Sequence, residues 1–272
     1  MFKLFFITNK VDIALAAEKA GVDRIWIDLE TLGKEQRQKN MDSVKSKHTI
    51  ANIREVSKEL STSEMLVRVN PWNENSKNEI DEVVDAGADV IMLPYWKSVH
   101  EVECFIDAVA GRCKTNLLVE TKEAVECIDT VIALKGIDEF HIGLNDLQIS
   151  YRNKYMFEPY ANGLLDSLSE KFKEAGVPFG VGGIGNFGAG FIPSPEQFIT
   201  EQYRLGSTAT ILSRSFCDVN KLGTIEKISE VLKKNVSIFR ELEDELVEMD
   251  QEQLEDNHQT IISEIADIVE SL

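Results

Sequence analysis

The feature that most constrains the fold of this chain is a repeated succession of a helix-like stretch, a glycine and a short hydrophobic run. Glycine commonly ends a helix in the left-handed conformation, and a short run that is apolar throughout is typical of a parallel strand buried on both faces. The succession therefore predicts alternating helices and parallel strands. Its clearest occurrences are 20–30 (AGVDRIWIDLE), 86–95 (AGADVIMLPY), 135–146, 175–183 and 205–214.

Eight hydrophobic runs can be counted, with stretches of helical spacing between them. Eight strand–helix units fit a closed (β/α)8 TIM barrel better than an open doubly wound sheet. No GxGxxG motif follows the first run, which lowers the support for a dinucleotide-binding fold. The predicted strands are Lys3–Thr8, Arg24–Leu29, Met65–Val69, Val90–Leu93, Asn116–Val119, Glu139–Gly143, Pro178–Val181 and Thr208–Leu212.

The pattern changes to helix alone near residue 221. Hydrophobic residues recur at spacings of three and four from Ile225 to Leu246 and again from Ile261 to Ile268. We therefore divide the chain into a (β/α)8 barrel, residues 1–221, and a C-terminal helical extension, residues 222–272. One helix would complete the barrel as its eighth. The rest would pack against a neighbouring subunit, so we expect a homo-oligomer formed through the C-terminal helices.

The chain has a formal net charge of −18, and its acidic residues gather at the end: from Phe239 to Leu272 there are twelve, against one basic residue. This charge argues against nucleic acid and anionic membranes as partners, and an acidic tail is usually a solvated helix face. The sequence contains no apolar run of the length that crosses a bilayer and no signal peptide. None of the four cysteines forms a CxxC pair. We expect a cytoplasmic protein with reduced cysteines.

Polar side chains stand where the predicted strands end. In a parallel barrel these ends meet at one mouth, which holds the catalytic groups. The sequence therefore predicts one site built from several strands. Its candidate residues are Asp28 and Glu30 after the second strand, Arg68 and Asn70 at the third, Glu120 after the fifth, Asn145 and Asp146 after the sixth, and Arg214 after the eighth.

Two of these acids, Glu120 and Asp146, could supply carboxylate oxygens to a hard divalent ion, because Mg²⁺ often takes one or two carboxylates. The alternative is that both acids cap helices. The guanidinium of Arg68 could hold a carboxylate of the substrate through two parallel hydrogen bonds. The alternative for this side chain is a structural ion pair with an acid of the second strand, and both roles can hold at once.

Two long segments and one glycine-rich stretch could bind ligands. Residues 182–190 with Arg214 stand where barrels often bind phosphate, although glycines there also serve turn geometry. Residues 143–161 are expected to form a long loop. Residues 30–48 form the other, and they carry the basic cluster Lys34, Arg37, Lys39, Lys45, Lys47 and His48. That cluster could meet a second anionic group of a substrate. Of the other histidines, we expect His141 to be hydrogen-bonded inside the barrel and His258 to be solvated.

Five motifs in register resemble the HpcH/HpaI aldolase and citrate lyase family, from about residue 3 to residue 217. They are IWIDLET (25–31), LVRVNP (66–71), AGADVIMLP (86–94), LLVET (117–121) and FHIGLNDL (140–147). The resemblance implies a (β/α)8 barrel whose C-terminal helices are exchanged between subunits. It also implies a divalent-metal-dependent reaction that breaks or forms a carbon–carbon bond through a pyruvate-type or acyl-CoA enolate.

Position by position, the resemblance implies roles for four residues. Glu120 and Asp146 match the metal ligands of that family, which would hold Mg²⁺ or Mn²⁺. Arg68 matches the arginine at the carboxylate and carbonyl of the substrate. The backbone N–H groups around Asn145 and Asp146 match those that hold the carboxylate of the bound keto acid.

One position departs from the pyruvate aldolases of that family, which carry a histidine where this chain has Thr31. A threonine hydroxyl cannot transfer protons near neutral pH as an imidazole can. The acid-rich motif resembles the citrate-lyase-like branch instead. Proton transfer would then fall to Glu30, to Asp28, to a metal-bound water or to His48, and we favour Glu30.

The sequence thus predicts a metal-dependent carbon–carbon lyase or aldolase. Its substrate would be a small anionic 2-oxo acid or acyl thioester, and phosphate or CoA could supply the second anionic group. One alternative is a Schiff-base aldolase that uses Lys97 or Lys122, although a nucleophilic lysine needs a desolvated site. Another is a catalytically inactive barrel that serves as a binding or assembly protein.

Overall fold

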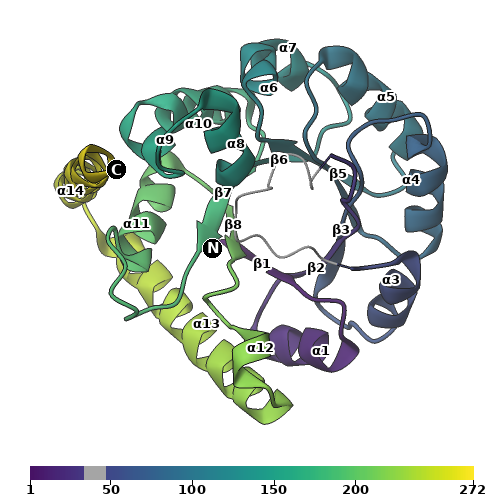
Figure 1. Ribbon diagram of the computed structural model, residues 1–272, viewed down its shortest axis with the longest axis horizontal. Coiled ribbons are helices and arrows are strands. Elements are labelled where there is room, and N and C mark those ends of the chain that lie inside the picture. The colour runs from purple at the N-terminus through teal and green to yellow at the C-terminus, as the bar shows by residue number, and fades with distance from the viewer. Residues whose placement is uncertain (34–46) are drawn as a thin grey trace.

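The computed structural model describes residues 1–33 and 47–272, in which eight parallel strands close into a barrel surrounded by helices (Figure 1). The strands follow one another in chain order, and the last pairs with the first. The predicted (β/α)8 barrel is therefore confirmed, with C-terminal helices after it. The strands are β1 (Lys3–Ile7), β2 (Arg24–Asp28), β3 (Glu64–Arg68), β4 (Val90–Leu93), β5 (Lys114–Val119), β6 (Glu139–Ile142), β7 (Phe179–Ile184) and β8 (Ala209–Leu212).

The helices begin and end at the local signals that the sequence carries. A capping box opens α3, α5, α11 and α14. In this motif the side chain of the N-cap residue accepts the backbone N–H of the third helical residue, and the side chain of that residue accepts the backbone N–H of the N-cap residue. The described helices are α1 (Val11–Ala20), α3 (Ile50–Ser57), α4 (Ser76–Asp85), α5 (Val99–Val109), α6 (Lys122–Glu126), α7 (Ile128–Ile132), α8 (Leu144–Tyr151), α9 (Glu158–Ala161), α10 (Leu164–Ala175), α11 (Pro195–Leu205), α12 (Val219–Leu222), α13 (Ile225–Glu248) and α14 (Gln251–Ser271). None of them is long and apolar enough to span a membrane.

Two segments differ from the prediction. Residues 143–161 contain α8 and α9, so this segment is largely helical rather than a loop. Strand β7 continues through Gly182 and Gly183, which we had placed in the glycine-rich stretch after it. These glycines serve close packing: a Cβ on Gly182 would lie 2.7 Å from Cδ1 of Leu144, too close for any real Cβ.

The apolar core divides into two regions because side chains alternate along each strand. On β2, Ile25 and Ile27 belong to the large region between the strands and the helices, whereas Trp26 belongs to the smaller one. The smaller region forms an apolar layer across the barrel, made of Phe5, Trp26, Leu66, Val90, Met92, Leu118 and Ala209.

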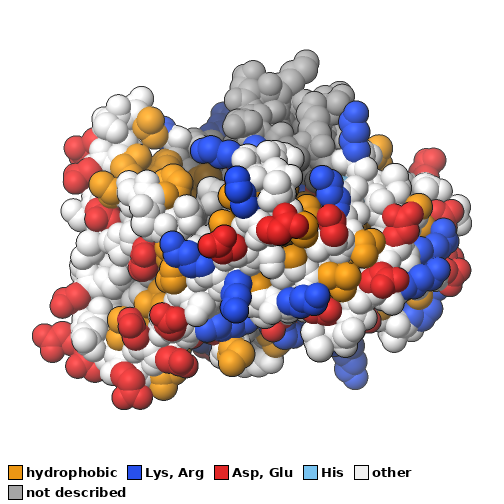
Figure 2. Space-filling view, turned by 90° about the horizontal axis from the view of Figure 1, so that it is seen from below, with side chains coloured by type: hydrophobic (Ala, Val, Ile, Leu, Met, Phe, Trp, Pro, Cys, Tyr) orange, Lys and Arg blue, Asp and Glu red, His pale blue; other side chains and the backbone are white. Residues whose placement is uncertain are grey.

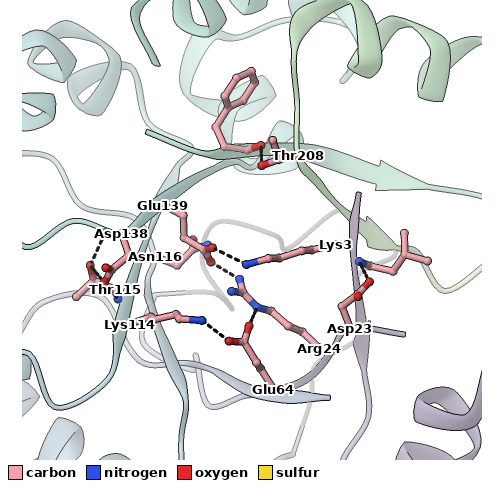
Figure 3. A network of polar contacts seen from close by, with 12 residues as sticks. Lys3, Asp23, Arg24, Glu64, Lys114, Thr115, Asn116, Asp138, Glu139 and Thr208 are labelled. Carbon is pink, nitrogen blue, oxygen red and sulfur yellow. Dashed lines mark hydrogen bonds and ion pairs between the residues drawn. The ribbon is translucent and has the colours of Figure 1, made fainter. Parts of the chain in front are cut away.

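At the N-terminal ends of the strands the barrel interior is charged, and Figure 3 shows the side chains that meet there. Arg24 is fully buried, donates Nε to Glu64 at 2.7 Å and Nη1 to Glu139, and lies over the ring of Phe5 at 4.9 Å. A buried cation is tolerable only when it is paired in this way. Further contacts to the two glutamates come from Lys3, Lys114 and Asn116. We call this set the basal network.

The C-terminal helices cover the outside of the barrel. α13 packs along α1 as the eighth barrel helix, and α14 packs on α9 and α11 of its own chain (Figure 1). The apolar face of α14 buries Leu254, Ile261 and Ile265 there. This face is therefore covered within the chain, and the homo-oligomer expected through the C-terminal helices stays a prediction. Acidic side chains gather in Figure 2 toward the side on which α14 lies in Figure 1.

His258 of α14 is not solvated, contrary to the prediction. Its Nδ1 lies 2.9 Å from Oε1 of Glu201 on α11, and its side chain is only 14% exposed. Glu201 is completely buried and also accepts hydrogen bonds from Arg204. A buried carboxylate is stable only with such partners, and this contact explains why His258 is buried rather than solvated.

Candidate active site

The C-terminal ends of the strands open into a cavity of about 710 Å³, which is of the size that holds small-molecule ligands. The apolar layer forms part of its floor through Trp26 and Leu118. The structure brings six of the eight candidate residues to this one cavity, whereas Glu30 and Asn70 do not line it. The residues that line it are Asp28, Arg68, Glu120, Asn145, Asp146 and Arg214.

The centre of one wall is an ion cluster around Arg68. Its Nε and Nη2 donate to the two carboxylate oxygens of Asp28, both at 2.9 Å, and Nη2 lies 3.3 Å from Oε2 of Glu30. The guanidinium also lies over the ring of Trp26, at 4.8 Å. The structural ion pair that we had considered for Arg68 is therefore present, and it includes Glu30, which does not line the cavity itself.

This cluster keeps Arg68 charged and leaves part of it for a ligand. Burial lowers the pKa of Arg68, but Asp28, Glu30 and, more weakly, Glu120 outweigh that effect, so its pKa is raised. Its side chain is 12% exposed. Among the described residues Nη1 makes no hydrogen bond or ion pair, so its two N–H groups can still bind an anion.

Glu120 is held at the end of β5 by a backbone group. Its Oε1 accepts the N–H of Tyr95 at 2.9 Å, and the side chain is 3% exposed. Tyr95 has a φ of 51°, which is unusual for a bulky residue. Glycine at position 143 makes room, since a Cβ there would lie 2.9 Å from Oε2 of Glu120. The cap of α6 is Thr121, so Glu120 is not the capping acid of that helix.

Asp146 lies in the first turn of α8, whose N-cap residue is Gly143. It is therefore not the N-cap, although an acid in the first turn is favoured by the helix dipole. Asp146 is 4% exposed, whereas Asn145 is exposed. The first N–H groups of a helix have no partner within it, which suits them to bind an anion at this end.

The donor chemistry of Glu120 and Asp146 fits a hard divalent ion. Both provide carboxylate oxygens to the same cavity. Within residues 1–33 and 47–272 no three His, Cys, Asp or Glu side chains are grouped to hold a metal. Because Mg²⁺ commonly uses one or two carboxylates and completes its shell with water and substrate, the pair is a sufficient protein contribution.

Thr31, Lys97 and Lys122 lie away from the cavity. Thr31 is exposed and donates its backbone N–H to Oδ1 of Asn70 at 2.9 Å. Lys97 and Lys122 are 43% and 56% exposed, pair with acids on α6, and do not line the cavity. Gly182 and Gly183 line it, as does the exposed Arg214. Four basic residues of the cluster, Lys34, Arg37, Lys39 and Lys45, lie outside the described residues.

Sequence reasoning missed the backbone N–H of Tyr95 as a support of the site. A signal existed, because Tyr95 follows β4 in the motif AGADVIMLPY, but side-chain type does not reveal a backbone contact. Lys10 also lines the cavity, just after β1, and had not been considered.

A family model described as HpcH/HpaI aldolase/citrate lyase matches residues 2–181 of this chain. The chain belongs to the HpcH/HpaI aldolase/citrate lyase family. Membership in this HpcH/HpaI family implies a carbon–carbon lyase of the aldolase or citrate lyase type, and the family is generally dependent on divalent metals. No curated protein matches the chain.

Three solved structures share the fold, and two of them are HpcH/HpaI proteins. The HpcH/HpaI aldolase of Desulfitobacterium hafniense DCB-2 is 16% identical, with a TM-score of 0.60 over 78% of this chain and 86% of that one. An HpcH/HpaI aldolase/citrate lyase family protein of Burkholderia cenocepacia J2315 is 17% identical, with a TM-score of 0.58 over 88% and 94%. RipC of Yersinia pestis is 12% identical, with a TM-score of 0.57 over 85% and 95%.

Proposed function

We propose that this HpcH/HpaI protein is a metal-dependent carbon–carbon lyase or aldolase that acts on a small 2-oxo acid or acyl thioester through an enolate. The observation that carries the proposal is the placement of a charged, doubly anchored arginine in the same cavity as a pair of buried carboxylates. Arg68 supplies positive charge for a developing enolate, and the carboxylates supply hard oxygen ligands.

Arg68 would bind and orient the substrate. Asp28 and Glu30 fix the plane of the guanidinium through Nε and Nη2, which leaves Nη1 for a carboxylate or carbonyl oxygen. A guanidinium that is already oriented loses little freedom on binding. Backbone N–H groups at Asn145 and Asp146 would hold the carboxylate of the substrate, and Arg214 would meet a second anionic group at the mouth of the cavity.

Glu120 and Asp146 would hold Mg²⁺ or Mn²⁺. When bound, such an ion supplies Lewis-acid polarisation of the substrate carbonyl. The contribution of the protein is to keep both carboxylates in place, and the N–H of Tyr95 does this for Glu120. A ligand group that is oriented before the ion arrives binds more tightly than one that must be ordered.

Proton transfer would belong to the Asp28–Glu30 pair. Arg68 contacts Asp28 with two nitrogens but Glu30 with one, so Asp28 is the better anchor of the guanidinium. We assign the transfer of the proton to Glu30, the less tightly held of the two acids. Substituting Glu30 by Gln should slow proton abstraction without loss of substrate binding.

The test pairs metal binding with enolisation. Glu120→Gln and Asp146→Asn should each lower the affinity for Mn²⁺ by about 10-fold or more, because each removes a charged ligand. The same variants should lose the Mn²⁺-dependent exchange of the methyl protons of pyruvate or acetyl-CoA in D₂O. Mn²⁺ binding can be followed by electron paramagnetic resonance, exchange by NMR, and folding by circular dichroism.

The matched control is Glu123→Gln, because Glu123 lies on the neighbouring helix α6, is 47% exposed and pairs with Lys97 outside the cavity. This variant should keep both metal affinity and exchange. The site assignment is wrong if Glu120→Gln and Asp146→Asn behave like this control. Wild-type protein that binds Mn²⁺ but exchanges neither pyruvate nor acetyl-CoA would refute the enolate reaction.

A further inference from the structure

Asn70 lies at the edge of the candidate site, and the reaction proposed above gives it no role. It follows Arg68 by two residues and does not line the cavity. The backbone pairing of β2 with β3 runs up to Leu29, whose N–H donates to the carbonyl oxygen of Arg68 at 2.9 Å. Beyond that point Oδ1 of Asn70 accepts the N–H of Thr31 at 2.9 Å and the N–H of Leu32 at 3.0 Å. One side-chain amide thus ties the segment after β2 to the end of β3.

The orientation of this amide is fixed from both sides. On the side of α4, Nδ2 of Asn70 donates to Oε1 of Glu79 at 2.7 Å, and the backbone N–H of Asn70 donates to Oε2 of the same carboxylate at 3.2 Å. A backbone N–H can only donate and an ionised carboxylate can only accept, so a single orientation of the amide satisfies both sets of partners. Glu79, in the first turn of α4, therefore holds the acceptor oxygen of Asn70 toward the segment after β2.

Glu30, the acid to which we assign the proton, lies between two backbone contacts. Its own N–H donates to Oδ1 of Asp28 at 3.2 Å, and the N–H of the next residue, Thr31, is bound by Asn70. The Glu30 carboxylate is buried and lies 3.3 Å from Nη2 of Arg68. The backbone is therefore anchored to β2 before Glu30 and to the end of β3 after it, which fixes the point from which the Glu30 side chain extends.

We propose that Asn70 is a positioning residue, which sets the place of the Glu30 carboxylate by binding the two N–H groups that follow Glu30. The inference rests on the proposed function and adds a residue to it. A general base must lie within hydrogen-bond reach of the proton that it takes, and a displacement of about 1 Å can lower a rate about 10²-fold. Without the amide of Asn70 the segment after Glu30 loses two hydrogen bonds. The guanidinium of Arg68 stays anchored by Asp28, so substrate binding is kept.

The first test reads the contacts of Asn70 and needs no turnover. Thr31 and Leu32 are exposed residues, so protection of their amides against hydrogen exchange reports the bonds to Asn70. Both amides should be protected in full-length wild-type protein, and Asn70→Leu should exchange them about 10-fold faster, as for the loss of one hydrogen bond. The control Asn78→Leu should leave them unchanged, because Asn78 is exposed on α4 and donates to Asn75. Unprotected amides in wild type, or equal protection in Asn70→Leu, would overturn the proposal.

The second test asks whether Asn70 acts through Glu30. Asn70→Leu should slow the Mn²⁺-dependent proton exchange of pyruvate or acetyl-CoA by about 10- to 10²-fold, with KM and the affinity for Mn²⁺ unchanged. In a Glu30→Gln background the same substitution should cost no more than about 3-fold, because the group that it positions is already absent. An additive loss in the double variant, a loss confined to KM, or a rate equal to that of wild type would overturn the positioning role.

Failure of the proposed function gives a different result. Wild-type protein that exchanges neither substrate, or Glu30→Gln that exchanges as fast as wild type, refutes the reaction or the assigned base, and the positioning role falls with it. Hydrogen exchange would in that case still show the bonds from Thr31 and Leu32 to Asn70. If Asn70→Leu does not fold, the protection in wild type decides whether the contact exists, and Asn70→Ala replaces it in the rate measurements.

Discussion

Lowering the pH should destabilise the barrel through one histidine. The ring of His141 is fully buried on β6, beside the ring of Phe5, and its Nε2 lies 3.1 Å from the carbonyl oxygen of Gly182. Burial lowers the pKa of His141 from 6.5 to about 4 because the charged ring loses its hydration. The unfolded chain therefore binds a proton below pH 6.5 that the folded chain refuses until about pH 4. Stability is lost as the pH falls through this window.

The magnitude follows from the two pKa values. At about pH 5 this histidine should lower the free energy of unfolding by about 2 kcal/mol, and below pH 4 by about 3 kcal/mol. We would measure urea unfolding of wild type and His141→Gln at about pH 7.5 and 5. Wild type should lose about 2 kcal/mol more than the variant, because other titrating groups cancel in this comparison.

Equal losses in the two proteins would refute the reasoning. If His141→Gln does not fold, the ring of His141 can be titrated by NMR in the wild type. A pKa near 6.5 in the folded protein would show that the buried ring accepts charge and that the argument fails.

Two further predictions concern the barrel interior. Burial raises the pKa of Glu64, but hydrogen bonds from its lysine and arginine partners outweigh this and lower the pKa from 4.5 to about 2. Glu64 therefore stabilises the fold above pH 4.5, and about 2 kcal/mol, reduced for its partial exposure, should be lost as the pH falls toward 2. The free energy of unfolding of Glu64→Gln should depend less on pH over this range, and a pH dependence equal to that of wild type would contradict the prediction. At Gly180 a Cβ would lie 2.4 Å from Nδ1 of His141, so Gly180→Ala should cost about 1–3 kcal/mol by calorimetry. An unchanged melting temperature would contradict the close packing.

The fold could be predicted because its signals are local. Each helix that ends on a glycine and each short apolar run carries its own evidence, and Gly21, Gly176 and Gly206 do end helices in the left-handed conformation. The failures are also local. Strand β7 continues across Gly182 and Gly183, where glycine reflects close packing, but glycine in a sequence is usually a sign of a turn.

The sequence was sufficient to predict which residues belong to the candidate site, but not which of them contact each other. Barrel topology alone brings the strand ends together, so listing their polar residues was enough to find Arg68, Glu120 and Asp146. Which groups bond each other depends on side-chain geometry that no spacing encodes. The two hydrogen bonds from Arg68 to Asp28 were one of two open alternatives. The contact of His258 with Glu201 was not foreseen, because the acidic tail suggested solvent.

The apolar layer inside the barrel has a consequence for the chemistry above it. Side chains such as Phe5, Trp26 and Leu118 fill the space between the basal network and the cavity. Apolar side chains have a low dielectric constant and screen charge poorly, so charges at one end of the barrel affect groups at the other end. His141 is an example: burial is the main cause of its lowered pKa, and smaller effects come from Glu139 and Arg24 of the basal network and from Arg68 in the cavity. The charges of the basal network therefore contribute to the electrostatic environment of the cavity, although no substrate in the cavity would touch them.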